Sequence, residues 1–329
     1  MSRLDFALRR QGITGSEIAA VAGVSRYSGP LDVWSRKLGL VPELEQTADM
    51  LRGHRLEPAL CDWAAEVVGL YPVDVGTLQC PTMPLVIASP DRLLFQRRAD
   101  DDDPREMRPV EALEVKAPAR TMHLWTDPED DPLGIDPQYL PQVTWEMLAA
   151  EVQRVTVAAL CYGQLWVYRL TLDPELAGLL VQAAERFWRD HILTRIPPEP
   201  TMGADAEVLR RLYPAEKAPL MPWPDGRPDD VITRWSDLDA TAKAAQEEAD
   251  RAKAQVMAEV GEAAGMERPG LWRITWKANK ASRKTDWEAV AMGAHAPPGL
   301  IEEHTIEKPG ARVLRYTDLA AKASKKRME

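Results

Sequence analysis

Short apolar segments alternate with helical patterns over the first half of the chain. The apolar segments 84–88 and 110–116 predict two neighbouring strands. Two helices are also predicted, one before and one after these strands in the chain. The segment 59–68 places Leu60, Trp63, Ala64 and Val67 on one side of a helix. The segment 137–146 has prolines at its start, which a first helical turn tolerates. This mixture of strands and helices predicts an α/β core.

The patterns change after residue 154. Alternating apolar residues on both sides of Cys161-Tyr162-Gly163 predict a β-hairpin over 155–170, and the segment 176–193 is an amphipathic helix. We therefore expect a core domain over residues 1–195. Many prolines follow, and they predict a linker or wrapping arm over 196–234.

The last part, 235–329, is expected to hold a long helix and a small β module. Residues 235–264 are rich in alanine and charge with weak apolar spacing, which favours a solvent-bridging helix or one strand of a coiled pair. Alternation predicts strands at 271–277 and 311–316. Trp272, Trp276 and the following basic residues either stack on unpaired bases or simply fill and border a small β core.

Two acids and a lysine stand out at the predicted strands. Asp91 follows the segment 84–88, and Glu114 and Lys116 lie two apart on 110–116, so they point to the same face of an extended strand. Carboxylates are the ligands that Mg²⁺ prefers, and such an ion lowers the pKa of a bound water and neutralises phosphoryl charge. Metal-assisted phosphodiester hydrolysis is therefore the functional interpretation. The alternative is an ordinary solvated sheet face.

Three further features lie around these residues. Glu57 is near the start of the helix predicted for 59–68, and Gln142 and Glu146 are four apart and share a helix face. The segment 12–18 is typical of a glycine turn that leads into a helix, whose free N–H groups suit a phosphate. Ser16 or Thr14 could instead only cap that helix.

In these motifs the sequence resembles the YqaJ-type viral recombinases, relatives of bacteriophage lambda exonuclease in the PD-(D/E)XK nuclease superfamily. The resemblance covers roughly residues 8–170 in family order. It rests on 12–18 with 30–34, on 53–58, on 89–91, on 113–118 and on 139–146. It implies a restriction-endonuclease-like core with a central mixed sheet flanked by helices. The segment Arg92-Leu93-Leu94 lacks the glycine that is common in the family just after the metal aspartate.

The resemblance also implies roles for individual residues. Asp91 and Glu114 would be metal-binding acids, Lys116 the catalytic lysine, Glu57 a helix acid that supports the metal, and Gln142 the glutamine that orients DNA or the nucleophile. Ser16, with Arg9 or Arg10, would hold a 5′ phosphate. The implied cofactor is Mg²⁺, with Mn²⁺ as a substitute.

The implied activity is digestion of one strand of linear double-stranded DNA from its 5′ end. The product would pass to a phage-type single-strand-annealing protein, and relatives form ring-shaped trimers around the duplex. Two alternatives stay open at this point. One is a structure-specific or restriction-type endonuclease on the same core, and the other is a non-catalytic DNA-binding protein.

Composition adds limits to this interpretation. The chain of 329 residues is 45% hydrophobic, enough for a large core, and its start has no apolar leader pattern, so we expect a cytoplasmic protein with no membrane association. The widely spaced Cys61, Cys80 and Cys161 are expected to be buried thiols. The net charge of −10 requires that any contact with DNA depend on local Lys and Arg.

Overall fold

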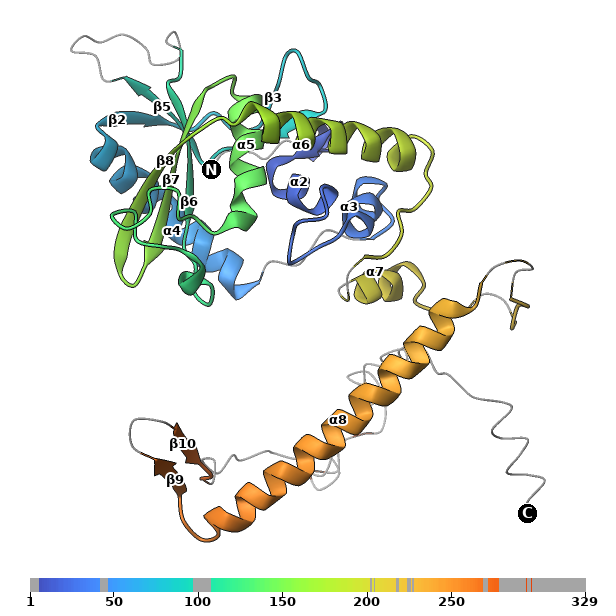
Figure 1. Ribbon diagram of the computed structural model, residues 1–329. Helices are drawn as coiled ribbons and strands as arrows, with labels where there is room; N and C mark the ends of the chain where they lie inside the picture. The colour runs from blue at the N-terminus through green and yellow to red at the C-terminus, as the bar shows by residue number, and fades with distance from the viewer. Residues whose placement is uncertain are drawn as a thin grey trace. The chain divides into compact units, whose positions relative to one another are not determined.

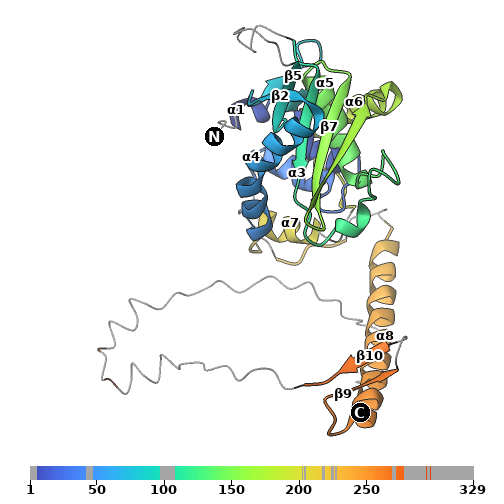
Figure 2. The same ribbon diagram turned by 90° about the vertical axis from the view of Figure 1, so that its left-hand side faces the viewer.

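The structure is a computed structural model of the chain, shown in Figures 1 and 2. It describes residues 6–41, 47–96, 108–201, 203, 205–216, 219–223, 226, 228–268, 272–277, 294 and 297. The chain divides into two compact units, Met1–Pro214 and Ala215–Glu329. The predicted linker, 196–234, contains this division.

A five-stranded mixed sheet is the centre of the first unit. Its order is β2-β5-β6-β7-β8, and β6 and β7 run parallel whereas the other neighbours are antiparallel. The strands are β2 (Leu70–Val73), β5 (Arg92–Gln96), β6 (Glu111–Lys116), β7 (Arg154–Cys161) and β8 (Gln164–Thr171). The predicted hairpin is confirmed as β7 and β8.

A small second sheet adjoins the first through a short connection. Its order is β1 (Ile13–Thr14), β4 (Val86–Ala88) and β3 (Leu78–Gln79), with β1 parallel to β4. The chain passes from β4 directly to β5 of the large sheet through residues 89–91. Asp91 therefore lies where the two sheets meet. The prediction that the segments 84–88 and 110–116 are neighbouring strands is wrong, because β4 and β6 belong to different sheets and β6 pairs with β5 and β7.

Helices cover both faces of the large sheet (Figures 1 and 2). Leu113 and Val115 of β6 pack against α4 (Ala48–Val68) on one face, whereas Ala112 packs with Val143 of α5 (Leu140–Ala149) on the other. Beyond α5, a mostly helical layer completes the core. It contains α2 (Gly15–Val21), α3 (Pro30–Lys37), α6 (Pro174–Phe187) with the π-helical turn Trp188–Ile192, and α7 (Asp205–Leu212). The predicted α/β core with a mixed sheet flanked by helices is confirmed.

Three shorter helical segments complete this description of the first unit. They are α1 (Phe6–Arg9) and the two 3-10 turns η2 (Met122–Leu124) and η3 (Pro137–Tyr139). The prolines in the segment 137–146 lie in η3 and in the first turn of α5, as predicted. All three cysteines are buried thiols, also as predicted.

The helix that precedes the large sheet differs from its prediction. It begins at Ala48 and runs through Pro58 instead of beginning near residue 59. Leu60 and Ala64 are buried as predicted, but Trp63 and Val67 are 45% and 58% exposed, and Cys61 and Ala65 are buried instead. Small side chains let the helix approach the sheet closely, and the two large ones face solvent.

The end of the core also differs from the predicted boundary at residue 195. Helix α7 lies inside the range predicted as a linker, yet Val208 is 3% exposed and packs with the helical layer. Arg211 of this helix is paired with Asp32 of α3. The core unit therefore includes α7.

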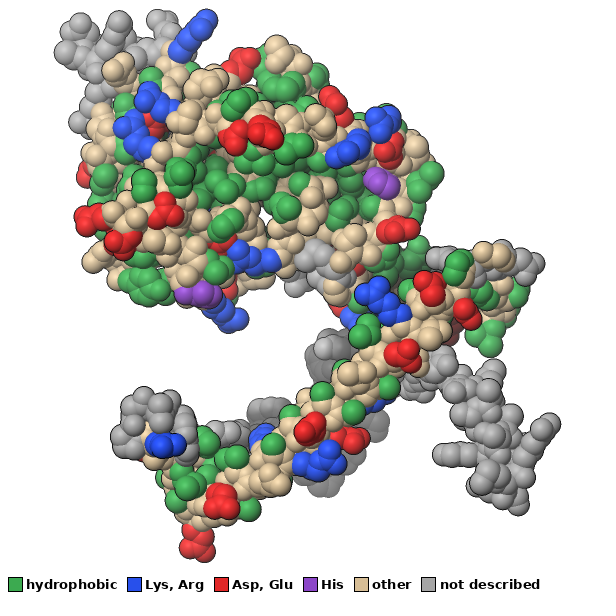
Figure 3. All heavy atoms as spheres, viewed as in Figure 1, with side chains coloured by type: hydrophobic (Ala, Val, Ile, Leu, Met, Phe, Trp, Pro, Cys, Tyr) green, Lys and Arg blue, Asp and Glu red, His purple; other side chains and the backbone are tan. Residues whose placement is uncertain are grey.

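The second unit is described by itself. Helix α8 (Asp230–Val260) begins five residues earlier than predicted, and Val260 is its buried residue. Acidic and basic side chains are interspersed along it (Figure 3), which fits a solvated helix. β9 (Gly265–Arg268) and β10 (Trp272–Thr275) form an antiparallel pair, of which the first strand was not predicted. The predicted strand 311–316 lies outside the described residues.

The exposure of Trp276 tests the interpretation that the tryptophans of the β module fill a small core. It is 47% exposed, so it does not fill a core. Among the described helices, none combines the length and the apolar character that a membrane crossing requires.

Candidate active site

The predicted acids and lysine meet at one end of β6. Glu114 and Lys116 point to the α5 side of the sheet, and Glu114 is only 4% exposed. Asp91 arrives from the connection between the two sheets, and its Oδ2 accepts a hydrogen bond of 2.8 Å from the backbone N–H of Val115. The ammonium of Lys116 donates to Oε1 of Glu114. The structure thus brings together three residues that the sequence separates by up to 25 positions.

Helix α5 contributes two more side chains to this cluster. The amide Nε2 of Gln142 donates to Glu114 Oε1 at 2.6 Å and to Glu146 Oε1 at 2.8 Å. Its Oε1 accepts from Lys116 Nζ at 3.3 Å. Gln142 therefore orients the acid and the lysine at once. We use the name acid–lysine cluster for Asp91, Glu114, Lys116, Gln142 and Glu146.

An aromatic ring closes one side of the lysine. Lys116 Nζ lies 4.7 Å from the centroid of the Tyr139 ring, a distance at which a cation is attracted to an aromatic face. Tyr139 ends η3, whose first turn is capped by Asp136 through the N–H of Gln138 at 3.2 Å. The direction of the lysine is thus fixed by two acceptors and a ring.

The cluster holds more negative charge than its one lysine compensates. Burial and the neighbouring Glu114 raise the pKa of Asp91 well above its usual range, against the opposing effects of Lys116 and the Val115 N–H. Burial and Glu114 likewise raise the pKa of Glu146. Burial alone would lower the pKa of Lys116, but Glu114 and Asp91 outweigh it and raise that pKa above its ordinary value. Lys116 is therefore an ammonium at neutral pH.

This imbalance fits a divalent cation. Glu146 is 1% exposed and its Oε2 is buried without a hydrogen-bond partner. Crowded carboxylates of this kind are hard oxygen donors, and added positive charge would lower their raised pKa values. Within the described part of the chain, however, no three His, Cys, Asp or Glu side chains already stand as a ready metal cluster. Lys116 and Gln142 contact the Glu114 oxygen that such an ion would compete for.

Glu57, the third predicted metal ligand, contacts two basic side chains. Its Oε1 lies 3.6 Å from Arg92 Nη1, and its Oε2 lies 3.7 Å from His54 Nδ1. Its charge still adds to the raised pKa of Asp91, so it lies near the cluster. Direct metal binding by Glu57 stays a prediction, and its observed contact is with the arginine next to Asp91.

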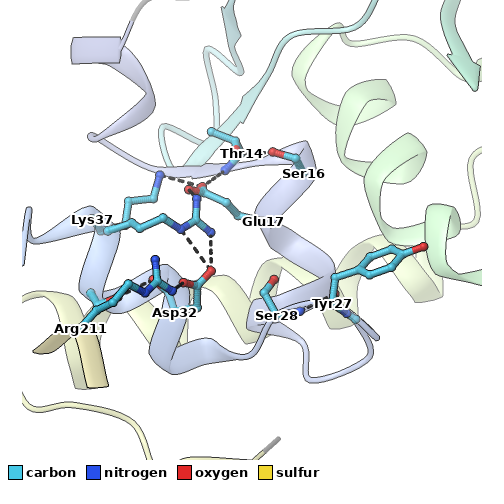
Figure 4. Close-up of polar contacts among 11 residues, drawn as sticks. Thr14, Ser16, Glu17, Tyr27, Ser28, Asp32, Lys37 and Arg211 are labelled. Carbon is cyan, nitrogen blue, oxygen red and sulfur yellow. Dashed lines mark hydrogen bonds and ion pairs between the residues drawn. The ribbon is translucent and has the colours of Figure 1, made fainter. Parts of the chain in front are cut away.

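The start of α2 lies beside the acid–lysine cluster. A Cβ on Gly15 would be 3.4 Å from Glu146 Oε1 and 3.5 Å from Gln142 Cγ, which are ordinary van der Waals distances, so the backbone at Gly15 lies next to these two side chains. Ser16 follows and is exposed. Thr14 is the residue at the helix N-cap, where its N–H donates to Glu17 Oε2 at 2.9 Å. The N-cap is therefore Thr14 and not Ser16, and the Ser16 hydroxyl lies 3.3 Å from that of Thr14 (Figure 4).

The two candidate arginines are placed differently. Arg9 ends α1 and is half-buried, and its backbone carbonyl accepts from Lys37 Nζ at 2.5 Å. Arg10 is exposed. A phosphate contact by either arginine stays a prediction.

Two residues of the site had not been assigned a role from the sequence. Glu146 shares a helix face with Gln142, and that spacing of four was the available signal. Tyr139 begins the segment 139–146 on which the resemblance rests, but its contact with Lys116 depends on how η3 packs beside β6, which no local pattern predicts.

Similarity to known proteins follows the same part of the chain. Residues 6–153 match the family described as the YqaJ-like viral recombinase domain. The uncharacterized protein YqaJ of Bacillus subtilis (strain 168) is 25% identical over 221 residues, which cover 65% of this chain and 64% of that protein.

Three solved structures are similar to the chain. LHK-Exo in complex with dAMP is 22% identical, with 63% of this chain and 95% of that chain covered and a TM-score of 0.45. The alkaline exonuclease LHK-Exo from Laribacter hongkongensis is 23% identical, with 58% and 95% covered and a TM-score of 0.44. A phage related exonuclease from Haemophilus somnus 129PT is 11% identical, with 56% and 96% covered and a TM-score of 0.42. The family that the sequence resembles is thus also the one whose model matches residues 6–153 of the chain.

Proposed function

We propose that the protein is a Mg²⁺-dependent DNA exonuclease that digests one strand of linear duplex DNA from the 5′ end. The observation that carries this proposal is the acid–lysine cluster, in which Asp91 and Glu114 come together with Lys116 inside a YqaJ-like domain. A protein that only bound DNA would have no need to bury this excess of carboxylates. The bound ion would come from the solvent, with Mn²⁺ as a substitute.

The residues of the cluster have distinct parts in hydrolysis. Asp91 and Glu114 would hold the metal, with Glu146 as the nearby third carboxylate. The ion would lower the pKa of a bound water and offset charge on the phosphoryl group. Lys116, held as an ammonium, donates a hydrogen bond to the scissile phosphate or the attacking water. Gln142 keeps the acid and the lysine in register.

The proposed preference for a 5′ phosphate rests on the position of Ser16. The hydroxyl is exposed, and the preceding Gly15 packs against Gln142 and Glu146. A terminal phosphate at Ser16 would therefore lie near the cluster, with Arg9 or Arg10 as the source of positive charge. By the family resemblance, the single-stranded product would be taken up by an annealing protein, and the nuclease would act as a ring-shaped homo-oligomer.

The test compares linear duplex, labelled at the 5′ end, with covalently closed circular duplex of the same sequence. We expect release of labelled nucleotides from the linear DNA only when Mg²⁺ is present, and no nicking of the circle. Asp91→Asn serves as the matched inactive variant. Cleavage of the circle at a similar rate would establish an endonuclease instead, and DNA binding without cleavage in any metal would establish a non-catalytic protein.

A further inference from the structure

The loop between α2 and α3 is fixed to the segment that leads into α5. The guanidinium of Arg26 lies 2.5 Å from Oδ1 of Asp136, whose side chain is completely buried. The backbone N–H of Arg26 also donates to Gln138 Oε1 at 3.4 Å. Burying a carboxylate is costly unless it is paired, so this contact holds the loop in one place.

The loop is also ordered by its own hydrogen bonds. Ser25 Oγ accepts from the N–H of Tyr27 at 3.1 Å and from the N–H of Ser28 at 3.4 Å. The backbone of Tyr27 is thus held locally through Ser25, while Arg26 fixes the loop from the other side. Figure 4 shows the Tyr27 ring extending away from the neighbouring group of ion pairs.

This ordered loop presents an aromatic ring to solvent. Tyr27 is 58% exposed, and the Arg26 guanidinium carbon lies 6.0 Å from its ring centroid. A single exposed aromatic residue is common on protein surfaces and needs no explanation by itself. Here, however, an ion pair between the partly exposed Arg26 and the fully buried Asp136 holds in place the loop that carries this exposed ring.

The ring lies on the approach to the acid–lysine cluster. Arg26, the residue before Tyr27, contacts Asp136 and Gln138, which stand just before Tyr139 in the chain. Burial raises the pKa of Tyr139, Lys116 opposes this effect, and Tyr27 adds a smaller rise. Tyr139 in turn lies against the Lys116 ammonium. The loop that carries Tyr27 is therefore joined to the segment whose Tyr139 contacts Lys116.

We propose that Tyr27 is a stacking platform for the base of a nucleotide next to the scissile phosphate. An aromatic face stacks on any base, so the contact would position the strand without reading its sequence. Arg26 would add positive charge at the edge of the ring, beside the phosphate backbone. This inference rests on the proposed function, because it takes a DNA strand at the acid–lysine cluster as the ligand.

The experiment measures binding and cleavage separately on 5′-phosphorylated duplexes in which one nucleotide near the end is abasic. Binding is followed by fluorescence anisotropy without divalent metal, and cleavage by single turnover in Mg²⁺. The proteins are the unmodified chain, Tyr27→Ala and Tyr27→Phe. Tyr71→Ala is the control, since Tyr71 is 45% exposed on β2, the edge strand of the sheet.

We expect the unmodified protein to bind the intact duplex about 10-fold more tightly than the duplex whose abasic nucleotide is the one that would stack on Tyr27. Tyr27→Phe and Tyr71→Ala should keep this preference, and Tyr27→Ala should lose it while binding the abasic end as the unmodified protein does. If Tyr27→Ala keeps the full preference, the stacking platform is refuted although the nuclease proposal stands. If the preference depends on Tyr27 but no DNA is cleaved, the platform stands and the nuclease proposal fails.

Discussion

Loss of the Lys37 ammonium should destabilise the first unit strongly. Lys37 Nζ lies 2.7 Å from Glu17 Oε2, and the two side chains are 4% and 8% exposed (Figure 4). Lys37→Met keeps the aliphatic stem but leaves Glu17 with the Thr14 N–H and with Arg36 at 3.9 Å. Removing one partner of a buried pair costs about 3–5 kcal/mol.

Two features place this change at the lower end of that range. Burial lowers the pKa of Lys37, and the attraction of Glu17 offsets only part of the effect, so the pair is weaker than its distance alone suggests. Arg36 can also move toward the Glu17 oxygen. We therefore expect about 3 kcal/mol for Lys37→Met, and a loss of roughly 1 kcal/mol for the double variant Glu17→Gln/Lys37→Met, in which no charge is left unpaired.

Scanning calorimetry of the full chain measures this difference through the transition of the first unit. Arg210→Met is the control, because Arg210 forms an exposed pair with Glu207 and should cost less than about 1 kcal/mol. The reasoning is refuted if Lys37→Met costs no more than this control. It is also refuted if the double variant is as unstable as the single one.

Three further predictions concern the acid–lysine cluster and its surroundings. Lys116→Ala should bind DNA normally but lower the single-turnover rate about 10²- to 10⁴-fold, and weak binding with a normal rate in saturated complex would reduce Lys116 to a phosphate anchor. Without metal, the pKa values of Asp91 and Glu146 in the folded protein exceed their unfolded values of about 3.9 and 4.3. Their protonated forms therefore stabilise the fold fully below about pH 4, and this stabilisation is lost as the pH rises through the folded pKa. Between pH 4 and 8, the melting temperature should therefore fall less steeply with pH for Asp91→Asn than for the unmodified protein. Identical slopes of melting temperature against pH in the two proteins would contradict this. Ser16→Ala should narrow the difference in digestion rate between 5′-phosphorylated and 5′-hydroxyl ends, and an unchanged ratio would exclude a phosphate contact.

The sequence alone predicted the positions of site residues that lie on one short strand or directly after one. Alternation on β6 predicted that Glu114 and Lys116 share a face, and the short connection after β4 placed Asp91 at the end of a strand. These relations depend on neighbours in the chain. The contact of Asp91 with the Val115 N–H, in contrast, depends on strand pairing that no local pattern specifies.

The side of α4 that is buried could not be predicted from the sizes of its side chains. Two apolar stripes exist on this helix, one with Trp63 and Val67 and one with Cys61 and Ala65. Hydrophobicity favours the larger residues, but close packing on a sheet favours the smaller ones. Pro58 also suggested a helix beginning at about residue 59, whereas packing of the longer helix on the sheet tolerates the lost hydrogen bond.

The most direct test of the account is single-turnover hydrolysis of 5′-phosphorylated linear duplex by the unmodified protein and by Glu114→Gln, with Mg²⁺ in excess. Glu114 is the residue that contacts both Lys116 and Gln142, and its charge raises the pKa of Asp91 and Glu146. The account predicts Mg²⁺-dependent hydrolysis that falls at least about 100-fold in Glu114→Gln, because the charge that holds the metal is removed. Glu129→Gln, a change at an exposed acid, should leave the rate unchanged. Hydrolysis by Glu114→Gln at the unmodified rate would contradict the assignment of the acid–lysine cluster as the active site.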